Sequence, residues 1–248
     1  MDKWTPEWKA EKLEFLADLW SDCGSCDLCQ TRTNVVFGIG NPNADILFIG
    51  EAPGGDEDEQ GIPFCGESGS LFDALLSLAN ISRGDTYITN IVACRPPNNR
   101  DPMKVERDFC RPRLNEIIYI VDPLVIVPIG AEALKALARG RDWSILDHHG
   151  TVFSSPRPEF RILGDPNGAE IPGRLFPRKG DDKKEHTLDY DMIPIVHPAF
   201  VLRTDGYDPK KPVFPQNGWA VKTVRDLEKI ATYVETIKAR YANPARPI

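Results

Sequence analysis

Residues 45–54 read Asp-Ile-Leu-Phe-Ile-Gly-Glu-Ala-Pro-Gly: a short apolar run, a glycine, and then the start of an acidic loop. An apolar run of this length that ends at turn residues predicts a buried β-strand. Similar runs occupy residues 86–92, 124–129 and 193–196. We therefore expect four buried strands, and 45–50 is the first of them.

Helical patterns separate these runs. Apolar residues recur at helical spacing in 67–80 and about 104–121, and an alanine-rich pattern covers 131–139. A helix is also expected before the first strand, from the capping signal Thr5-Pro6-Glu7 to about residue 22, and another over 218–240. Strands that alternate with helices form βαβ units, so the sequence predicts an α/β fold with a mostly parallel sheet.

Polar residues follow each predicted strand directly. They are Gly50 to Gly54, then Asn90, then Gly130, and then His197 with Pro198. The carboxyl ends of parallel strands meet at one edge of a sheet, where open α/β sheets bind their ligands. We therefore expect these segments to form one site.

The composition limits the class of protein. The chain has 248 residues, of which 41% are hydrophobic, and a net charge of −7. It contains no apolar run long enough for a membrane span and no apolar core of a secretory signal, so we expect one cytoplasmic, nucleoid-associated domain over 1–248. Taken alone, this negative net charge argues against a protein whose whole surface is basic and binds phosphate groups. Residues 1–60, however, hold 13 acidic and 4 basic residues, so the later residues can still form a local basic face.

Residues 154–190 interrupt the alternation of strands and helices. They contain five prolines and a run of mixed charge over 178–185. We expect a loop insertion within the domain, because such composition does not favour a packed element. Its basic residues can contact DNA or a partner, but a solvated loop explains them equally simply. They are Arg157, Arg161, Arg174, Arg178, Lys179, Lys183 and Lys184.

The six cysteines are unevenly spaced. Cys23, Cys26 and Cys29 are three apart, and Cys65, Cys94 and Cys110 follow. Two cysteines separated by two residues, joined by two from a distant segment, would close a zinc or an iron–sulfur site. The spacing chooses neither metal and does not settle whether Cys29 is a ligand. The alternative is a surface pair of cysteines with buried thiols elsewhere.

The acidic loop, Asn90 and His197 suggest chemistry on a polar ligand. Five acidic residues after Gly50 make a poor phosphate cradle, but carboxylates suit orienting a water or stabilising a developing cation. A solvated acidic turn is the alternative. Asn90 can read an amide-like edge with one donor and one acceptor, or cap a turn. His197 can act as an acid or electrophile, although a single histidine is more often structural.

The ordered set of motifs resembles the iron–sulfur (family 4) uracil-DNA glycosylases. Each motif is weak alone, and their order and separation make the match specific. The matching segments lie at 23–28, 32–42, 50–54, 57–58, 61–66, 88–90, 94–102, 110 and 197–203. The resemblance implies a three-layer α/β/α fold with a small central, mostly parallel sheet. It also implies a [4Fe–4S] cluster.

The resemblance assigns a role to each matching residue. Four cysteines would hold the cluster: Cys23, Cys26, Cys94 and Cys110. Catalysis would fall to Glu57 on the water, His197 near uracil O2 and Glu51, which would also crowd a 5-methyl group. Around the base, Phe64 would stack on it, Asn90 would read its edge, and Ala52 and Gly50 would complete the pocket. Apart from the resemblance, the segment after His197 offers an apolar wedge, Val201 and Leu202, and a cation, Arg203, which suit insertion into the vacated base stack and a phosphate contact. The alternative is a strand-to-helix turn whose side chains contact the core.

The sequence therefore predicts a monomeric, monofunctional uracil-DNA glycosylase. It would flip deoxyuridine out of DNA, hydrolyse the N-glycosidic bond, release uracil and leave an abasic site for base-excision repair. A related group traps uracil covalently on a histidine, but residues 96–102 contain none, which favours turnover. Ala199 replaces the serine common in the family. Two alternatives stand: a catalytically silent uracil- or DNA-binding module, and a zinc-stapled hydrolase of free nucleotides.

Overall fold

The computed structural model describes residues 4–138, 143–156, 189–206 and 215–242. Six strands in these ranges form one sheet with the order β1-β3-β2-β4-β6-β5. The four inner strands are parallel, and each edge strand is antiparallel to its neighbour. The strands are β1 (Ile39–Gly40), β2 (Ile46–Gly50), β3 (Tyr87–Asn90), β4 (Val125–Pro128), β5 (Phe153–Pro156) and β6 (Asp189–Met192).

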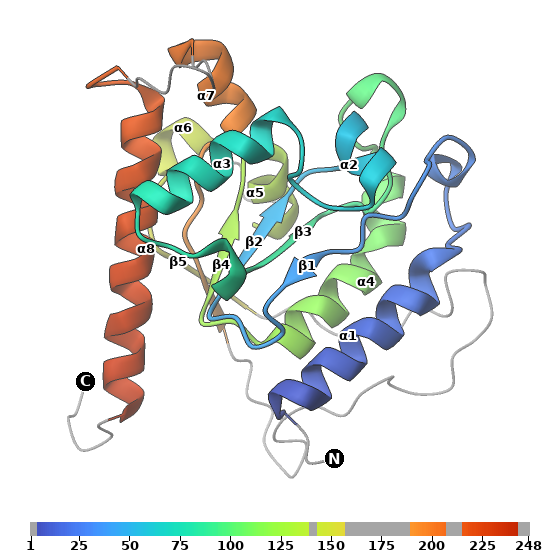
Figure 1. The fold of residues 1–248 in the computed structure, drawn as a ribbon, viewed down its shortest axis with the longest axis horizontal. Coiled ribbons are helices and arrows are strands. Elements are labelled where there is room, and N and C mark those ends of the chain that lie inside the picture. Colours follow the sequence, from blue (N-terminus) through green and yellow to red (C-terminus); the bar gives the residue numbers. More distant parts are fainter. Residues whose placement is uncertain (1–3, 139–142, 157–188, 207–214, 243–248) are drawn as a thin grey trace.

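Helices cover both faces of this sheet (Figure 1). Helices α3, α7 and α8 lie on one face, and α1 and α4 lie on the other. The helices are α1 (Pro6–Ser21), α2 (Gly55–Gln60), α3 (Glu67–Leu78), α4 (Lys104–Val121), α5 (Ala131–Leu137), α6 (Ile145–His148), α7 (Pro198–Asp205) and α8 (Trp219–Ala242). None of them, within the described ranges, is both long enough and apolar enough to cross a bilayer.

The central strand β2 explains why there are three layers. Successive side chains of a strand point to opposite faces, and every residue of β2 is buried. Leu47 and Ile49 belong to the core beneath α1 and α4, whereas Ile46 and Phe48 belong to the core beneath α3 and α8. An apolar strand that packs on both faces is typical of a parallel sheet covered by helices. The predicted α/β/α architecture is confirmed.

Three predicted segments differ from the structure. The expected strand 193–196 begins too late, because strand β6 covers 189–192. Residues 193–195 continue the pairing with β4: the Ile193 N–H donates to the Ile126 oxygen, the Ile195 N–H donates to the Pro128 oxygen, and Ile195 forms a parallel bridge with Ile129. The acidic loop after Gly50 contains helix α2, and the segment after His197 forms helix α7.

The expected insertion at 154–190 is partly wrong at its ends. Residues 153–156 and 189–192 pair as the antiparallel strands β5 and β6. The remaining part, 157–188, lies outside the described residues, as do the seven basic side chains that the sequence indicated there.

Candidate active site

A cleft of about 490 Å³ opens at the carboxyl ends of the inner strands. It is lined from four segments by Glu51 and its neighbours after β2, by Asn90 at the end of β3, by Gly130 after β4 and by His197 before α7. The sequence predicted that these segments would meet, and the structure brings them together. Ala52 and Phe64 line the same cleft.

Asn90 has an unusual environment. The residue is 1% exposed, and neither its side-chain nitrogen nor its side-chain oxygen has a hydrogen-bond partner among the described residues. Its backbone oxygen, by contrast, is fixed, because the guanidinium of the buried Arg113 donates to it at 2.5 Å. A buried amide without partners costs free energy unless a ligand or water completes it. The amide of Asn90 is thus available to a ligand in the cleft.

Gly50 lets Asn90 and Phe64 approach each other. A Cβ atom at Gly50 would lie 2.3 Å from the Asn90 side-chain oxygen and 2.8 Å from the Phe64 ring. Such distances are inside van der Waals contact, so any larger residue at position 50 would displace both side chains. Gly50 shapes the pocket by leaving space.

Phe64 forms an aromatic wall of the cleft. Its backbone is left-handed, with φ 52°, which is rare for a bulky residue. The ring packs 5.3 Å from that of Phe72 in the core and 5.9 Å from that of His197, measured between centroids. A planar ligand beside Asn90 would therefore meet an aromatic surface that the core supports.

His197 is held as a neutral side chain. It caps helix α7, and its Nδ1 atom accepts a hydrogen bond of 3.1 Å from the backbone N–H of Ala199. The proton of a neutral ring therefore sits on Nε2, the other nitrogen. Burial, with a smaller effect of the Arg203 charge, lowers the pKa of His197 to about 4. At neutral pH the cleft contains an uncharged N–H donor.

Glu57 is engaged by the backbone. Its carboxylate accepts hydrogen bonds from the N–H groups of Gly54 at 3.0 Å, Cys65 at 3.1 Å and Gly66 at 3.0 Å. These bonds tie the start of α2 to the segment that carries Phe64. Glu57 lines the cleft, as predicted, and its carboxylate holds the aromatic wall in place.

Glu51 also tends toward its neutral form. Burial raises the pKa of Glu51 to about 7, and the negative charges of Asp101 and Glu132 add to the shift. The positive charges of Arg107 and Lys135 act in the opposite direction. Sequence reasoning missed these partners of Glu51, although Glu132 follows the strand-end Gly130 by only two residues.

The three predicted DNA-contacting residues do not share one environment. Val201 is fully buried in the core beneath α7, so its assignment to a wedge is wrong. Leu202 is half-buried against the same core, and Arg203 is exposed and lines the cleft. Because helical positions 198 and 201 face inward, only the other side of α7 is available for contacts.

The four predicted metal ligands line one small cavity. Cys23 and Cys26 follow α1, Cys94 follows β3 and Cys110 lies on α4. Cys29 does not line this cavity, and Cys65 lies beside Phe64 in the active-site segment. Within the described ranges, no three or more His, Cys, Asp or Glu side chains are already gathered closely enough to hold a metal ion.

Two hydrogen-bond donors point at these sulfurs. The Arg32 guanidinium donates to Cys94 Sγ at 3.5 Å, and the Ala93 N–H donates to Cys110 Sγ at 3.4 Å. Such donors stabilise thiolates and tune iron–sulfur sites. Four cysteines on one cavity, with donors to two sulfurs, fit the ligand set of a four-cysteine cluster.

Comparison with known proteins places these features in a family. The model described as "Uracil DNA glycosylase superfamily" matches residues 37–220. The type-4 uracil-DNA glycosylase of Archaeoglobus fulgidus is 45% identical over 192 residues, which cover 77% of this chain and 84% of that protein. Its counterpart in Sulfurisphaera tokodaii is 43% identical, covering 73% and 90%. That of Thermotoga maritima is 43% identical, covering 57% and 74%.

Proposed function

Since the chain belongs to the uracil-DNA glycosylase superfamily, we propose that its cleft accepts a uracil flipped out of DNA and that the protein hydrolyses the N-glycosidic bond. The reaction releases uracil and leaves an abasic site. A base inside a duplex is out of reach of any such site, so extrusion has to precede the chemistry.

The unpartnered amide of Asn90 carries this proposal. Uracil presents, side by side, a carbonyl acceptor and an N–H donor, and a fixed amide can pair with both. Cytosine has an amino donor in place of the O4 carbonyl and an acceptor nitrogen in place of the N3–H, so an amide in the same orientation would lose both pairings. A site built around buried hydrogen bonds rejects such an analogue strongly. The burial of Asn90 and its fixed backbone oxygen support this role.

Phe64 and His197 supply the other contacts of the base. The Phe64 ring offers a stacking surface at the side of the pocket. Cleavage leaves negative charge on uracil, and the Nε2–H of a neutral His197 can donate to O2 as this charge develops. The Nε2–H donor of the neutral ring is in place before the reaction, because Nδ1 already accepts a hydrogen bond from the Ala199 N–H.

The two glutamates take different roles. Glu51 lines the cleft, and we assign to it the exclusion of a 5-methyl group on the base. Glu57 orders the segment of Phe64 through three backbone hydrogen bonds and has a carboxylate at the cleft that can still orient the attacking water. The negative charge of Glu57 also suits the cationic sugar of the transition state.

The cysteine cavity suits a [4Fe–4S] cluster held by Cys23, Cys26, Cys94 and Cys110. The cluster would supply a structural crosslink between the segment after α1, the end of β3 and α4. Protein prepared without oxygen should be brown, with four irons per chain. Replacing Cys110 by Ser should remove colour and iron together. Colourless protein with one zinc per chain would overturn this assignment.

The described residues of one chain line the cleft from several segments, which supports a function carried by a single chain. We propose a monomer that acts on DNA in the cytoplasm. Exposed cations at the cleft, Arg100 and Arg203, are placed to meet phosphates of the strand that carries the flipped base.

Incubation with a uracil-containing single-stranded oligonucleotide, followed by alkali, tests the function. The wild type should cleave the strand at uracil, and Asn90→Ala should lower the rate by roughly a thousandfold or more. Asn43→Ala is the matched control, because it removes the same amide before the opposite end of β2. If stoichiometric wild-type protein yields no abasic product, the chain is a binding module and the proposed activity is wrong.

A further inference from the structure

A buried arginine on helix α4 contacts the strand end that carries Asn90. The side chain of Arg113 has no exposed surface. Its Nη2 atom donates to the backbone oxygen of Asn90 at 2.5 Å and to that of Ile91 at 3.4 Å. Its Nη1 atom donates to the backbone oxygen of Phe37 at 2.7 Å and to Thr89 Oγ1 at 3.1 Å. A single guanidinium therefore joins the end of β3 to the segment before β1.

The peptide group between Asn90 and Ile91 is held at both ends. Its carbonyl oxygen accepts the hydrogen bond from Arg113, and its N–H donates to the backbone oxygen of Gly50 at 2.9 Å. Rotation of this peptide group would break both bonds. The backbone from which the Asn90 side chain projects is therefore fixed relative to β2 and α4.

The Asn90 amide depends on this fixed backbone. Among the described residues, neither of its polar side-chain atoms has a hydrogen-bond partner that could set its direction. The amide lies close to Gly50 and to the Phe64 ring, which limit its space by contact alone. The direction in which its donor and acceptor face the pocket is therefore set by the backbone and by packing.

The positive charge of Arg113 argues against a merely structural role. A guanidinium stays protonated when it is buried, and the acceptors that Arg113 contacts among the described residues are neutral oxygens. A buried charge without a counter-charge is a poor means of stabilising a fold, and apolar side chains of similar volume often do as well or better. What the charge supplies is a set of strong hydrogen bonds to the end of β3.

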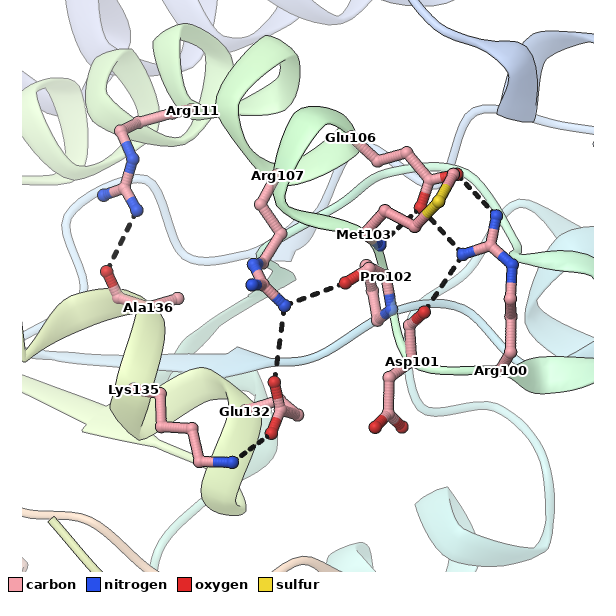
Figure 2. A network of polar contacts seen from close by, with 10 residues as sticks. All are labelled: Arg100, Asp101, Pro102, Met103, Glu106, Arg107, Arg111, Glu132, Lys135 and Ala136. Carbon is pink, nitrogen blue, oxygen red and sulfur yellow. Dashed lines mark hydrogen bonds and ion pairs between the residues drawn. The ribbon is translucent and has the colours of Figure 1, made fainter. Parts of the chain in front are cut away.

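The helix that carries Arg113 is itself anchored (Figure 2). Arg107 donates to the backbone oxygen of Pro102 at 2.8 Å, and Arg111 donates to that of Ala136 at 3.0 Å. These bonds tie α4 to the segment before it and to α5. Arg113 thus reaches β3 from a fixed element, as accurate positioning requires.

We propose that Arg113 is a positioning residue for base selection, which fixes the peptide group after Asn90 and thereby the direction in which the Asn90 amide faces the base. This inference rests on the proposed function. Arg113 is not among the described residues that line the cleft, so it acts through Asn90 and not on the base. Its contribution to excision should therefore disappear when the Asn90 amide is absent.

A double-mutant cycle on uracil excision tests the inference. Arg113→Lys keeps the charge but loses the planar fork of donors, so the single-turnover rate should fall by roughly ten- to a hundredfold. In the Asn90→Ala background the same substitution should change the rate by less than about twofold, because no amide is left to misplace. Enzyme in excess over DNA keeps the slow Asn90→Ala reaction measurable.

Two further variants make the cycle decisive. Arg113→Gln removes the charge as well as the fork, so it provides the same cycle without a buried ammonium group and separates the result from any folding defect of Arg113→Lys. Ile117→Val changes a buried residue one turn further along α4. It should lower the unfolding temperature and leave the single-turnover rate unchanged.

The outcomes separate the inference from the function. Equal losses from the Arg113 substitution in the wild-type and Asn90→Ala backgrounds would show a general structural role and overturn the inference, while wild-type excision would still establish the function. An inactive wild type would overturn both. A loss confined to the background that retains Asn90 supports the positioning role.

Discussion

His197 and Glu51 lie in one cleft, and burial moves their pKa values in opposite directions. The pKa of His197 falls to about 4, and that of Glu51 rises to about 7. Both shifts favour the uncharged form near neutral pH. The pocket can therefore offer hydrogen bonds to an uncharged base without confronting it with a full charge on either side chain.

The shift at His197 makes a prediction for stability. The unfolded chain binds a proton at His197 between about pH 6.5 and pH 4, and the folded protein does not. The contribution of the neutral ring to the free energy of unfolding is thus fully present above pH 6.5 and is lost as pH falls toward 4. The side chain of His197→Gln cannot titrate. As pH falls from 6.5 to 5, the free energy of unfolding of the variant should therefore rise by about 1.5 kcal/mol relative to that of the wild type. Urea unfolding at the two pH values measures this difference.

Glu51→Gln provides the control of opposite sign. The folded protein keeps the Glu51 proton between about pH 4.5 and pH 7, whereas the unfolded chain releases it. The free energy of unfolding of the wild type therefore falls as pH rises through that window, whereas that of Glu51→Gln does not change for this reason. A His197→Gln protein with the same pH dependence as the wild type would show that the ring is not buried in its neutral form.

Sequence reasoning found the residues that follow strands and missed those that act on them from elsewhere. Asn90 and His197 stand directly after apolar runs, so their position at the site could be predicted. Glu132 follows the strand-end Gly130 closely and could have been noticed, whereas Arg113 reaches Asn90 only through the packing of α4 against the strand ends. No local pattern in the chain encodes that packing, and it becomes visible only in three dimensions.

At the scale of elements, helix α7 shows how a missed helix leads to a wrong side-chain assignment. His197 caps the helix and Pro198 takes its first position, which is a recognisable start signal. Treated as a loop, the segment offered both Val201 and Leu202 to DNA. Treated as a helix, it places Val201 in the core and Arg203 at the cleft.

Arg203 should therefore carry the phosphate contact of this element. Arg203→Gln should weaken binding to DNA of any sequence, and the slope of log affinity against log salt should become shallower by about 1. Fluorescence anisotropy at several salt concentrations gives both quantities.

Lys238 offers a matched cation for this test. It lies on α8 and pairs with Asp45, which precedes β2 and thus lies away from the cleft. Lys238→Gln should leave the salt slope unchanged. An equal loss of slope in the two variants would mean that general charge, rather than the cleft-facing side of α7, governs DNA binding.

Across the whole molecule, the sheet separates two cores. The cysteine cavity belongs with α4 and the segment after α1, and this layer packs through Leu13, Leu16 and Trp20 of α1. The aromatic wall of the pocket belongs with the core beneath α3 and α8. The local stability of each helical layer can thus be measured separately, by a change that affects only one layer.

Loss of the proposed cluster should loosen one layer first. In Cys110→Ser, or after treatment with an oxidant and a chelator, amide hydrogen exchange should accelerate over α1, residues 22–30 and α4. The amide hydrogens of α3 and α8 should remain protected from exchange, because these helices pack in the other core, away from Cys23, Cys26, Cys94 and Cys110. Exchange mapped by mass spectrometry measures both. Uniform acceleration over the two layers would contradict a crosslink confined to one.

The continuous apolar run of β2 was enough to predict a buried strand of a mostly parallel sheet, and the three layers were expected from the family resemblance. The edge strand β5 and its neighbour β6 were not predictable to the same degree. Their partnership joins residues separated by 32 others, and Pro156 and Asp189 carry no strand signal of their own. Non-local pairing, rather than local preference, defines this edge of the sheet.

The unpartnered amide of Asn90 has a consequence for turnover. The amide that we propose selects uracil in DNA can form the same hydrogen bonds with free uracil, so the product should be retained after the bond is broken. Free uracil should inhibit excision and raise the temperature of unfolding in the wild type, by an amount that grows with its concentration. In Asn90→Ala both effects should vanish. Selectivity and product release are thus opposed at one side chain, and the departure of uracil becomes a step that can limit the rate.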